Sequence, residues 1–91
     1  MTRVLLIGNG AREHAIAEAI LRSEQKPRLY SFMKTKNPGI ASVSEAVCIG
    51  RYDDPASVVA FARKAGIDFA VVGPEEPLGH GVVDALATAG I

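Results

Sequence analysis

The residues best suited to chemistry lie near the start of the chain, in a glycine-rich stretch that follows an apolar run. They read Gly8-Asn9-Gly10-Ala11-Arg12-Glu13-His14. A glycine-rich turn from a strand into a helix exposes backbone N–H groups at the positive end of the helix dipole, where anions and electron-rich oxygens bind. Arg12 adds a planar guanidinium that suits phosphate or carboxylate, although a solvated surface charge is an equally good interpretation. We therefore expect this loop to bind an anion or an oxygen-rich ligand.

A second candidate loop follows a later apolar run and places two acids between prolines. It reads Gly73-Pro74-Glu75-Glu76-Pro77-Leu78. Proline fixes its own φ and stiffens the backbone, which can hold a carboxylate ready to accept hydrogen bonds from hydroxyl or amine groups. Glu75 is the acid nearer to the preceding strand, and we expect it to contact a ligand. A rigid turn with solvated glutamates explains the same residues equally well.

The first loop matches the dinucleotide-binding fingerprint G-x-G-x-x-G only in part. Gly8 and Gly10 fit, but Glu13 stands where the third glycine lets helix and strand pack closely. The acid that binds the ribose of NAD is also missing after the second predicted strand, because lysines stand there. Lysines suit a 2′-phosphate, so an NADP-binding module of an oxidoreductase or regulator stays open as the alternative function. The Gly-Lys-Ser or Gly-Lys-Thr of a P-loop is absent from the sequence.

Composition excludes several classes of site. Ten basic and ten acidic side chains cancel among 91 residues, so no global field favours nucleic acid or an anionic membrane. His14 and His80 are the only histidines in the sequence, and without a ligand cluster we expect no metal site. The one cysteine, Cys48, lies in an apolar run and is interpreted as a buried structural thiol. No apolar run approaches the roughly 20 residues needed to span a bilayer, so we expect a cytoplasmic protein.

Apolar runs and helical spacings alternate along the chain. Short apolar runs predict strands over residues 4–7, 28–32, 46–49 and 69–72. Helical spacing predicts helices over about 11–23, 55–65 and 79–89. Residues 33–45 break both periodicities, which predicts a long loop with room for one helical turn. This alternation predicts a doubly wound α/β domain, with a parallel sheet and helices on both of its faces.

Local signals refine these elements. Asp54 before Pro55 predicts a helix N-cap, and Gly66 predicts the end of the same helix. The apolar positions of the first and last helices are Ala15, Ile16, Ala19 and Ile20, and Val82, Val83 and Leu86. Because the alternation calls for another strand after Gly90, we expect the chain to be truncated within a larger protein.

Two motifs, with matching order and spacing, resemble the phosphoribosylamine–glycine ligases across nearly all of the chain. The first is the opening strand with its glycine-rich loop, in which Arg12-Glu13-His14 is the specific part. The second runs from Ile67-Asp68 through Gly73-Pro74-Glu75-Glu76-Pro77-Leu78 to Gly81-Val82-Val83-Asp84. Two departures stand out: many members have a second adjacent glycine in place of Ala11, and a Pro-Gly-Asn loop in place of Asn37-Pro38-Gly39.

The resemblance implies a Rossmann-like pre-ATP-grasp fold in an ATP-dependent ligase of purine biosynthesis. That enzyme joins glycine to 5-phosphoribosylamine and yields glycinamide ribonucleotide, ADP and phosphate. Residues 1–91 then form the N-terminal substrate-binding domain, while the ATP and Mg²⁺ ligands belong to an ATP-grasp domain outside this sequence. The implied role is to position substrate by proximity, with no catalytic acid or base. The residues expected to bind phosphoribosylamine are Gly8, Asn9, Gly10, Arg12, Glu13, His14, Asn37, Pro38, Gly39, Gly73, Pro74 and Glu75.

Overall fold

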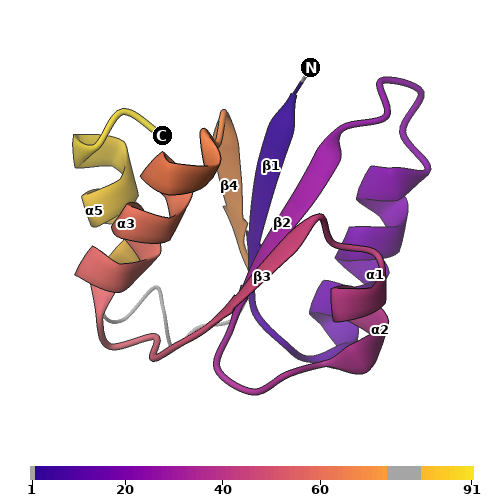
Figure 1. Cartoon of the computed structure of the whole chain (residues 1–91), viewed down its shortest axis with the longest axis horizontal. Helices are drawn as coiled ribbons and strands as arrows, with labels where there is room; N and C mark the ends of the chain where they lie inside the picture. The colour runs from indigo at the N-terminus through magenta and orange to yellow at the C-terminus, as the bar shows by residue number, and fades with distance from the viewer. Residues whose placement is uncertain (1, 74–80) are drawn as a thin grey trace.

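Strands and helices alternate along the chain in the computed structural model, which describes residues 2–73 and 81–91 (Figure 1). The strands are β1 (Arg3–Ile7), β2 (Arg28–Met33), β3 (Ala46–Ile49) and β4 (Phe69–Val72). The helices are α1 (Ala11–Leu21), α2 (Pro38–Ser42), α3 (Pro55–Ala65) and α5 (Val82–Thr88). The predicted strands agree with these bounds to within one residue. The loop expected over residues 33–45 contains the single short helix α2.

The four strands form one parallel sheet in the order β3-β2-β1-β4. The chain moves from β1 through β2 to β3, and then crosses back to place β4 on the other side of β1. Strand order therefore reverses between β1 and β4. In open α/β sheets, ligands bind beyond the carboxyl ends of the strands at such a reversal. The predicted α/β fold is confirmed, and its topology marks the ends of β1 and β4.

Helices cover both faces of the sheet, as predicted. Figure 1 shows α1 and α2 on one face and α3 and α5 on the other. Because side chains alternate along a strand, β1 supplies both cores. Leu5 and Ile7 join the cluster beneath α3 and α5, whereas Leu6 joins the cluster beneath α1 and α2. All three side chains have no exposed surface.

Side-chain caps fix where two of the helices begin. Asp54 accepts a hydrogen bond from the Ser57 N–H at 3.3 Å and stands before Pro55, as predicted for the start of α3. Gly66 ends α3 with a φ of +70°, a value that favours glycine. Asn37 caps α2 in the same way, and Pro38 occupies the first turn, where its missing N–H costs nothing.

Three predictions about burial are corrected by the structure. In α1 the buried residues are Glu13 and Ala17, and Ile16 and Ile20 pack half-buried against the core as expected. Ala15 and Ala19 are exposed, so the inward face is only partly the expected one. In α5, Val82 is buried but Val83 is 44% exposed. Cys48 is half-buried at the edge of a core cluster instead of fully buried. In both helices the inward residues follow a spacing of three or four, which adjacent apolar residues cannot all satisfy.

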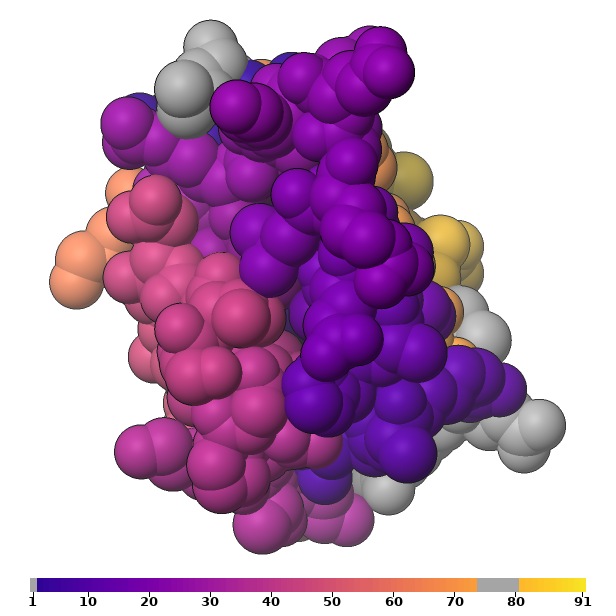
Figure 2. Space-filling view, turned by 90° about the vertical axis from the view of Figure 1, so that its right-hand side faces the viewer, coloured from indigo at the N-terminus to yellow at the C-terminus, as the bar shows by residue number. Residues whose placement is uncertain are grey.

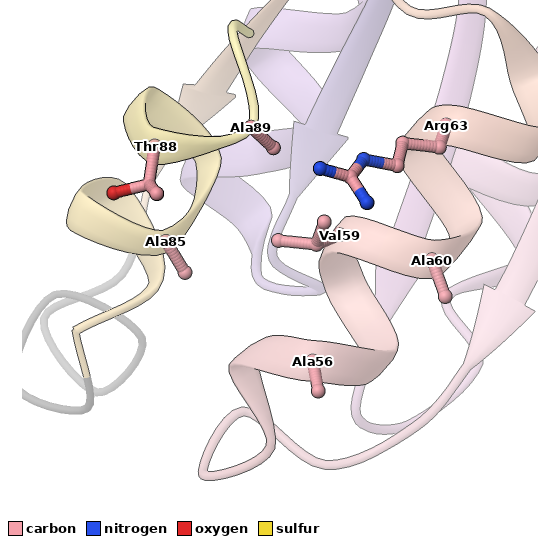
Figure 3. Close-up of a pocket in the computed structure, with 7 residues that line it drawn as sticks. All are labelled: Ala56, Val59, Ala60, Arg63, Ala85, Thr88 and Ala89. Atoms are coloured by element: carbon pink, nitrogen blue, oxygen red, sulfur yellow. The ribbon is translucent and has the colours of Figure 1, made fainter.

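An apolar groove of about 460 Å³ is lined by residues of α3 and α5 (Figure 3). Its lining residues are Ala56, Val59, Ala60, Arg63, Ala85, Thr88 and Ala89. Arg63 is the one charged side chain among them. In the described part of the chain, no helix is long and apolar enough to cross a membrane.

Candidate functional site

The ends of β1 and β4 meet at the point where strand order reverses. Gly8 donates its N–H to the Phe32 carbonyl at 3.0 Å, and Gly73 donates its N–H to the Ile7 carbonyl at 3.1 Å. These bonds continue the sheet ladder one residue past each strand. The two predicted loops therefore start side by side at the carboxyl edge of the sheet, drawn at the bottom of Figure 1.

The Glu13 side chain fills the space between these two loop starts. It is only 4% exposed, and its Oε1 accepts the Gly10 N–H at 3.0 Å, which satisfies a free donor at the start of α1. A Cβ on Gly73 would lie 2.7 Å from Glu13 Cγ, and a Cβ on Gly8 would overlap the same atom. Gly8 also has a φ of +140°, which favours glycine. Both glycines therefore leave room for one buried carboxylate.

This carboxylate changes what the glycine-rich loop offers a ligand. The N–H groups of Gly8 and Gly10, expected to serve as donors, are both used within the protein. The Glu13 carboxylate, which is paired with Arg12, already meets the positive end of the α1 dipole and compensates it. In dinucleotide-binding proteins the glycines let the pyrophosphate approach the backbone. Here Glu13 takes that place, which argues against the NADP alternative.

Arg12 ties the two loops together. Its Nη2 donates to the Gly73 carbonyl at 2.7 Å, and its Nε donates to Glu13 Oε2 at 3.2 Å. The side chain is nevertheless 67% exposed. Because a guanidinium has five N–H donors, an exposed ligand oxygen can be bound while both contacts remain. The structure thus places Arg12, Glu13 and Gly73 in one cluster at the reversal point.

A second cluster joins three loops through Asn9. The Tyr52 hydroxyl donates to Asn9 Oδ1 at 2.5 Å, and Asn37 Nδ2 donates to the Asn9 carbonyl at 3.0 Å. Asn37 Oδ1 accepts from the N–H groups of Gly39 and Ile40, at 3.0 and 3.2 Å. Asn37 is therefore both a helix cap and a cross-link. The order Asn-Pro-Gly in this chain suits that double role, because the cap residue must precede the proline at the first helical position.

Tyr52 was not identified as a site residue from the sequence. In the structure it is only 4% exposed and packs against Phe32, with ring centroids 6.5 Å apart. Its signal was an aromatic residue in the polar stretch directly after the third strand. An amphipathic ring with a buried body needs a partner for its hydroxyl, and at this edge of the sheet the partner is a loop residue.

His14 belongs to the packing between helices. A Cβ on Gly39 would lie 2.8 Å from His14 Nε2, so the absence of a side chain lets the imidazole pack against α2. The same Nε2 lies 3.3 Å from Glu18 Oε1 one turn along α1. The space-filling view shows α1 and α2 side by side on this face (Figure 2). These contacts give His14 and Gly39 a packing role, and their binding of a substrate stays a prediction.

Charged residues follow the ends of β2 and β3. Arg51 binds Asp53 with two bonds, from Nε at 2.8 Å and from Nη2 at 2.6 Å. The hydrogen bond to Asp53, together with the charge of that carboxylate, raises the pKa of the Arg51 guanidinium above its usual value. The guanidinium therefore stays positively charged over the whole physiological pH range.

Two of the predicted binding residues, Pro74 and Glu75, lie outside the described residues. The binding roles of all the predicted residues stay predictions. Among residues 2–73 and 81–91, no group of three or more His, Cys, Asp or Glu side chains is placed to hold a metal ion. The clusters around Glu13 and Asn9 can bind hydroxyl, amine or carbonyl groups through hydrogen bonds. They supply no nucleophile paired with a base.

Comparison with known proteins shows the family to which this chain is similar. The family model described as phosphoribosylglycinamide synthetase, N domain, matches residues 2–91. The phosphoribosylamine–glycine ligase of Methanocaldococcus jannaschii is 52% identical over 89 residues, which cover 98% of this chain and 20% of that protein.

Two further relatives with the same name show similar values. The protein of Methanococcoides burtonii is 50% identical over 97% of this chain, and that of Pyrococcus furiosus is 47% identical over all of it. In each case the chain spans about a fifth of the relative's length. The match over residues 2–91 and the identity near one half show that the chain belongs to the phosphoribosylglycinamide synthetase N domain family.

Proposed function

We propose that this chain is the N-terminal domain of a ligase that joins glycine to 5-phosphoribosylamine in purine biosynthesis. The products are glycinamide ribonucleotide, ADP and phosphate. The proposal is supported by relatives named phosphoribosylamine–glycine ligase, which match the chain over almost its entire length. ATP and Mg²⁺ belong to the proposed full-length enzyme, in a part outside this sequence.

The role we propose for this domain is to form one wall of the phosphoribosylamine site. The observation that carries it is the convergence of Asn9, Arg12 and Gly73 at the carboxyl edge, where strand order reverses. Amide and guanidinium groups suit a ligand rich in hydroxyl groups. Holding the amine at a fixed position supplies the proximity that accelerates its attack on an activated glycine.

A titration of the isolated chain tests this role. Glycinamide ribonucleotide should bind, and NADPH, the ligand of the alternative function, should not. Arg12→Gln should weaken ribonucleotide binding by about tenfold, the effect of losing one charge-assisted hydrogen bond. Arg22→Gln removes the same charge from the other end of α1 and should have no effect. Binding of NADPH in place of the ribonucleotide would reject the proposed function.

Thermal unfolding of each variant must accompany the titration, because Arg12 also donates to the Gly73 carbonyl. A folded Arg12→Gln protein with unchanged affinity would remove Arg12 from the site. The role of Arg12 would then be limited to its hydrogen bonds with Gly73 and Glu13.

A further inference from the structure

A small polar pocket lies beyond the ends of β2 and β3, apart from the Glu13 cluster. Its volume is about 280 Å³, and its lining residues are Lys34, Arg51, Tyr52 and Asp53. Lys34 directly follows β2, and the other three residues follow β3 by way of Gly50. The pocket therefore opens at the same carboxyl edge as the proposed substrate wall.

We infer that this pocket binds the phosphate group of a sugar phosphate, with Lys34 and Arg51 as its cationic ligands. The inference rests on the proposed function and names where the phosphate of that substrate lies. Two observations carry it: the pocket gathers two cations at the ligand-binding edge, and the glycine-rich loop, the other candidate for an anion, already holds the carboxylate of Glu13.

Arg51 is held in a defined orientation by its neighbour. Asp53 accepts from Nε and from one N–H of Nη2, so three of the five guanidinium donors remain by count. A planar guanidinium presents its donors in pairs that match two phosphate oxygens. The ammonium of Lys34 adds a second positive charge at the neighbouring strand end. Asp53 and the nearby Asp54 offset part of this positive charge. The pocket therefore offers a phosphate the paired donors of Arg51 and the ammonium of Lys34, and not a large net charge.

Tyr52 connects this pocket to the proposed substrate wall. The ring packs against Phe32, and the hydroxyl donates to the Asn9 side chain. Asn9 follows β1, and the pocket lies at β2 and β3, one to two strands away. Neighbouring strands are about 4.8 Å apart, so the two regions are roughly 5–10 Å apart. A pentose phosphate can span that interval, with its phosphate at Arg51 and its sugar near Asn9.

The test compares two ligands on the full-length protein that contains this domain. Glycinamide ribonucleotide carries the phosphate, and glycinamide riboside is the same molecule without it. Arg51→Gln and Lys34→Gln should each weaken ribonucleotide binding about tenfold, and leave riboside binding unchanged. Arg63→Gln is the matched control, because it removes a charge from the α3–α5 groove. It should change neither affinity.

Each outcome bears on one proposal. If wild-type protein binds the ribonucleotide and both variants bind it equally well, the phosphate pocket is rejected and the proposed function stands. The phosphate pocket is also rejected if the variants lose affinity for both ligands alike. If wild-type protein binds neither ligand, the proposed function itself fails.

Asp53→Asn tests whether the negative charge of Asp53 weakens the binding of the phosphate. An asparagine still accepts a hydrogen bond from Arg51 but removes a negative charge beside the bound phosphate. Ribonucleotide affinity should therefore rise severalfold at low salt, and the gain should shrink as salt screens the charges. A loss of affinity for both ligands would show that the carboxylate itself binds the sugar or amine, and would overturn the assignment of an anion pocket.

Discussion

At the scale of single residues, Glu13 is notable as a buried carboxylate at the carboxyl edge of the sheet. A glutamate is almost never fully buried unless its carboxylate is paired, and this one accepts from the Gly10 N–H and from Arg12. It occupies the third position of α1, where a carboxylate can reach back to the N-cap N–H and also meets the positive end of the dipole. Its burial is thus a consequence of local helix chemistry combined with the lack of side chains on nearby glycines.

Replacing this carboxylate should destabilise the domain. We expect Glu13→Ala to lower the free energy of unfolding by about 1–3 kcal/mol, because the Gly10 N–H loses its acceptor and a cavity opens between the loops. Glu18→Ala, on the exposed side of α1, should cost less than about 0.5 kcal/mol. Urea unfolding of both variants is the measurement. Equal costs at the two positions would contradict a structural role for Glu13.

A double-mutant cycle can show that the glycines make room for Glu13. Gly73→Ala should cost about 1–3 kcal/mol alone, because its Cβ would overlap Glu13, and should cost much less in the Glu13→Ala background. Gly8→Ala should stay costly in both backgrounds, since the strain of its positive φ does not depend on Glu13. Additive costs for Gly73→Ala and Glu13→Ala would mean that the two sites do not share this space.

At the scale of elements, the sequence predicts a strand or a helix end well where a single local pattern specifies it. Apolar runs predicted all four strands of residues 2–73 and 81–91, and Asp54-Pro55 and Gly66 marked the two ends of α3. The face of a short helix is harder to predict, because adjacent apolar residues fit more than one face. In α5 the contacts with α3 and the sheet select Val82 and Leu86, and Val83 is left exposed.

Alanine substitutions at adjacent positions test this orientation of α5. Val82→Ala removes two methyl groups from a side chain with no exposed surface, and we expect it to cost roughly 1.5–3 kcal/mol. Val83→Ala should change stability by less than about 0.5 kcal/mol. Denaturant unfolding at matched protein concentration compares the two. A larger cost at Val83 would mean that α5 is rotated about its axis.

The candidate site could be predicted only in part, for a physical reason. Loop composition located the carboxyl edge with Asn9 and Arg12, and the family resemblance added Asn37. Which of their polar groups are already used depends on contacts between residues far apart in sequence. The Arg12 bond to the Gly73 carbonyl and the Tyr52 bond to Asn9 join segments separated by 61 and 43 positions. No local pattern reports such pairs.

At the scale of the whole molecule, the strand order collects the chemistry at one edge. The order β3-β2-β1-β4 brings the loops after β1, β2 and β3 together, and places the end of β4 beside the first of them. Hydrogen bonds from Asn37, Tyr52 and Arg12 then join these loops to one another. The loops at this edge are therefore connected by hydrogen bonds into one continuous surface.

This surface should bind without catalysing. With ATP, glycine and phosphoribosylamine, we expect the 91-residue chain to release no ADP beyond background, since its clusters contain no activated nucleophile and the relatives are about five times longer. A coupled assay for ADP measures this, with the full-length protein as positive control. Release that depends on both substrates would overturn the division of roles proposed above.

The glutamate between the glycines also bears on how such proteins diverge. Glu13 stands at the third glycine position of G-x-G-x-x-G, and one base change converts either glutamate codon into a glycine codon. That change would empty the space beside Gly8 and Gly73 and leave the start of α1 without its own counter-charge. The Glu13 carboxylate thus meets the same positive helix end that a pyrophosphate meets in dinucleotide-binding proteins. The residue at position 13 therefore decides whether this space is filled from within the chain or left open to a ligand.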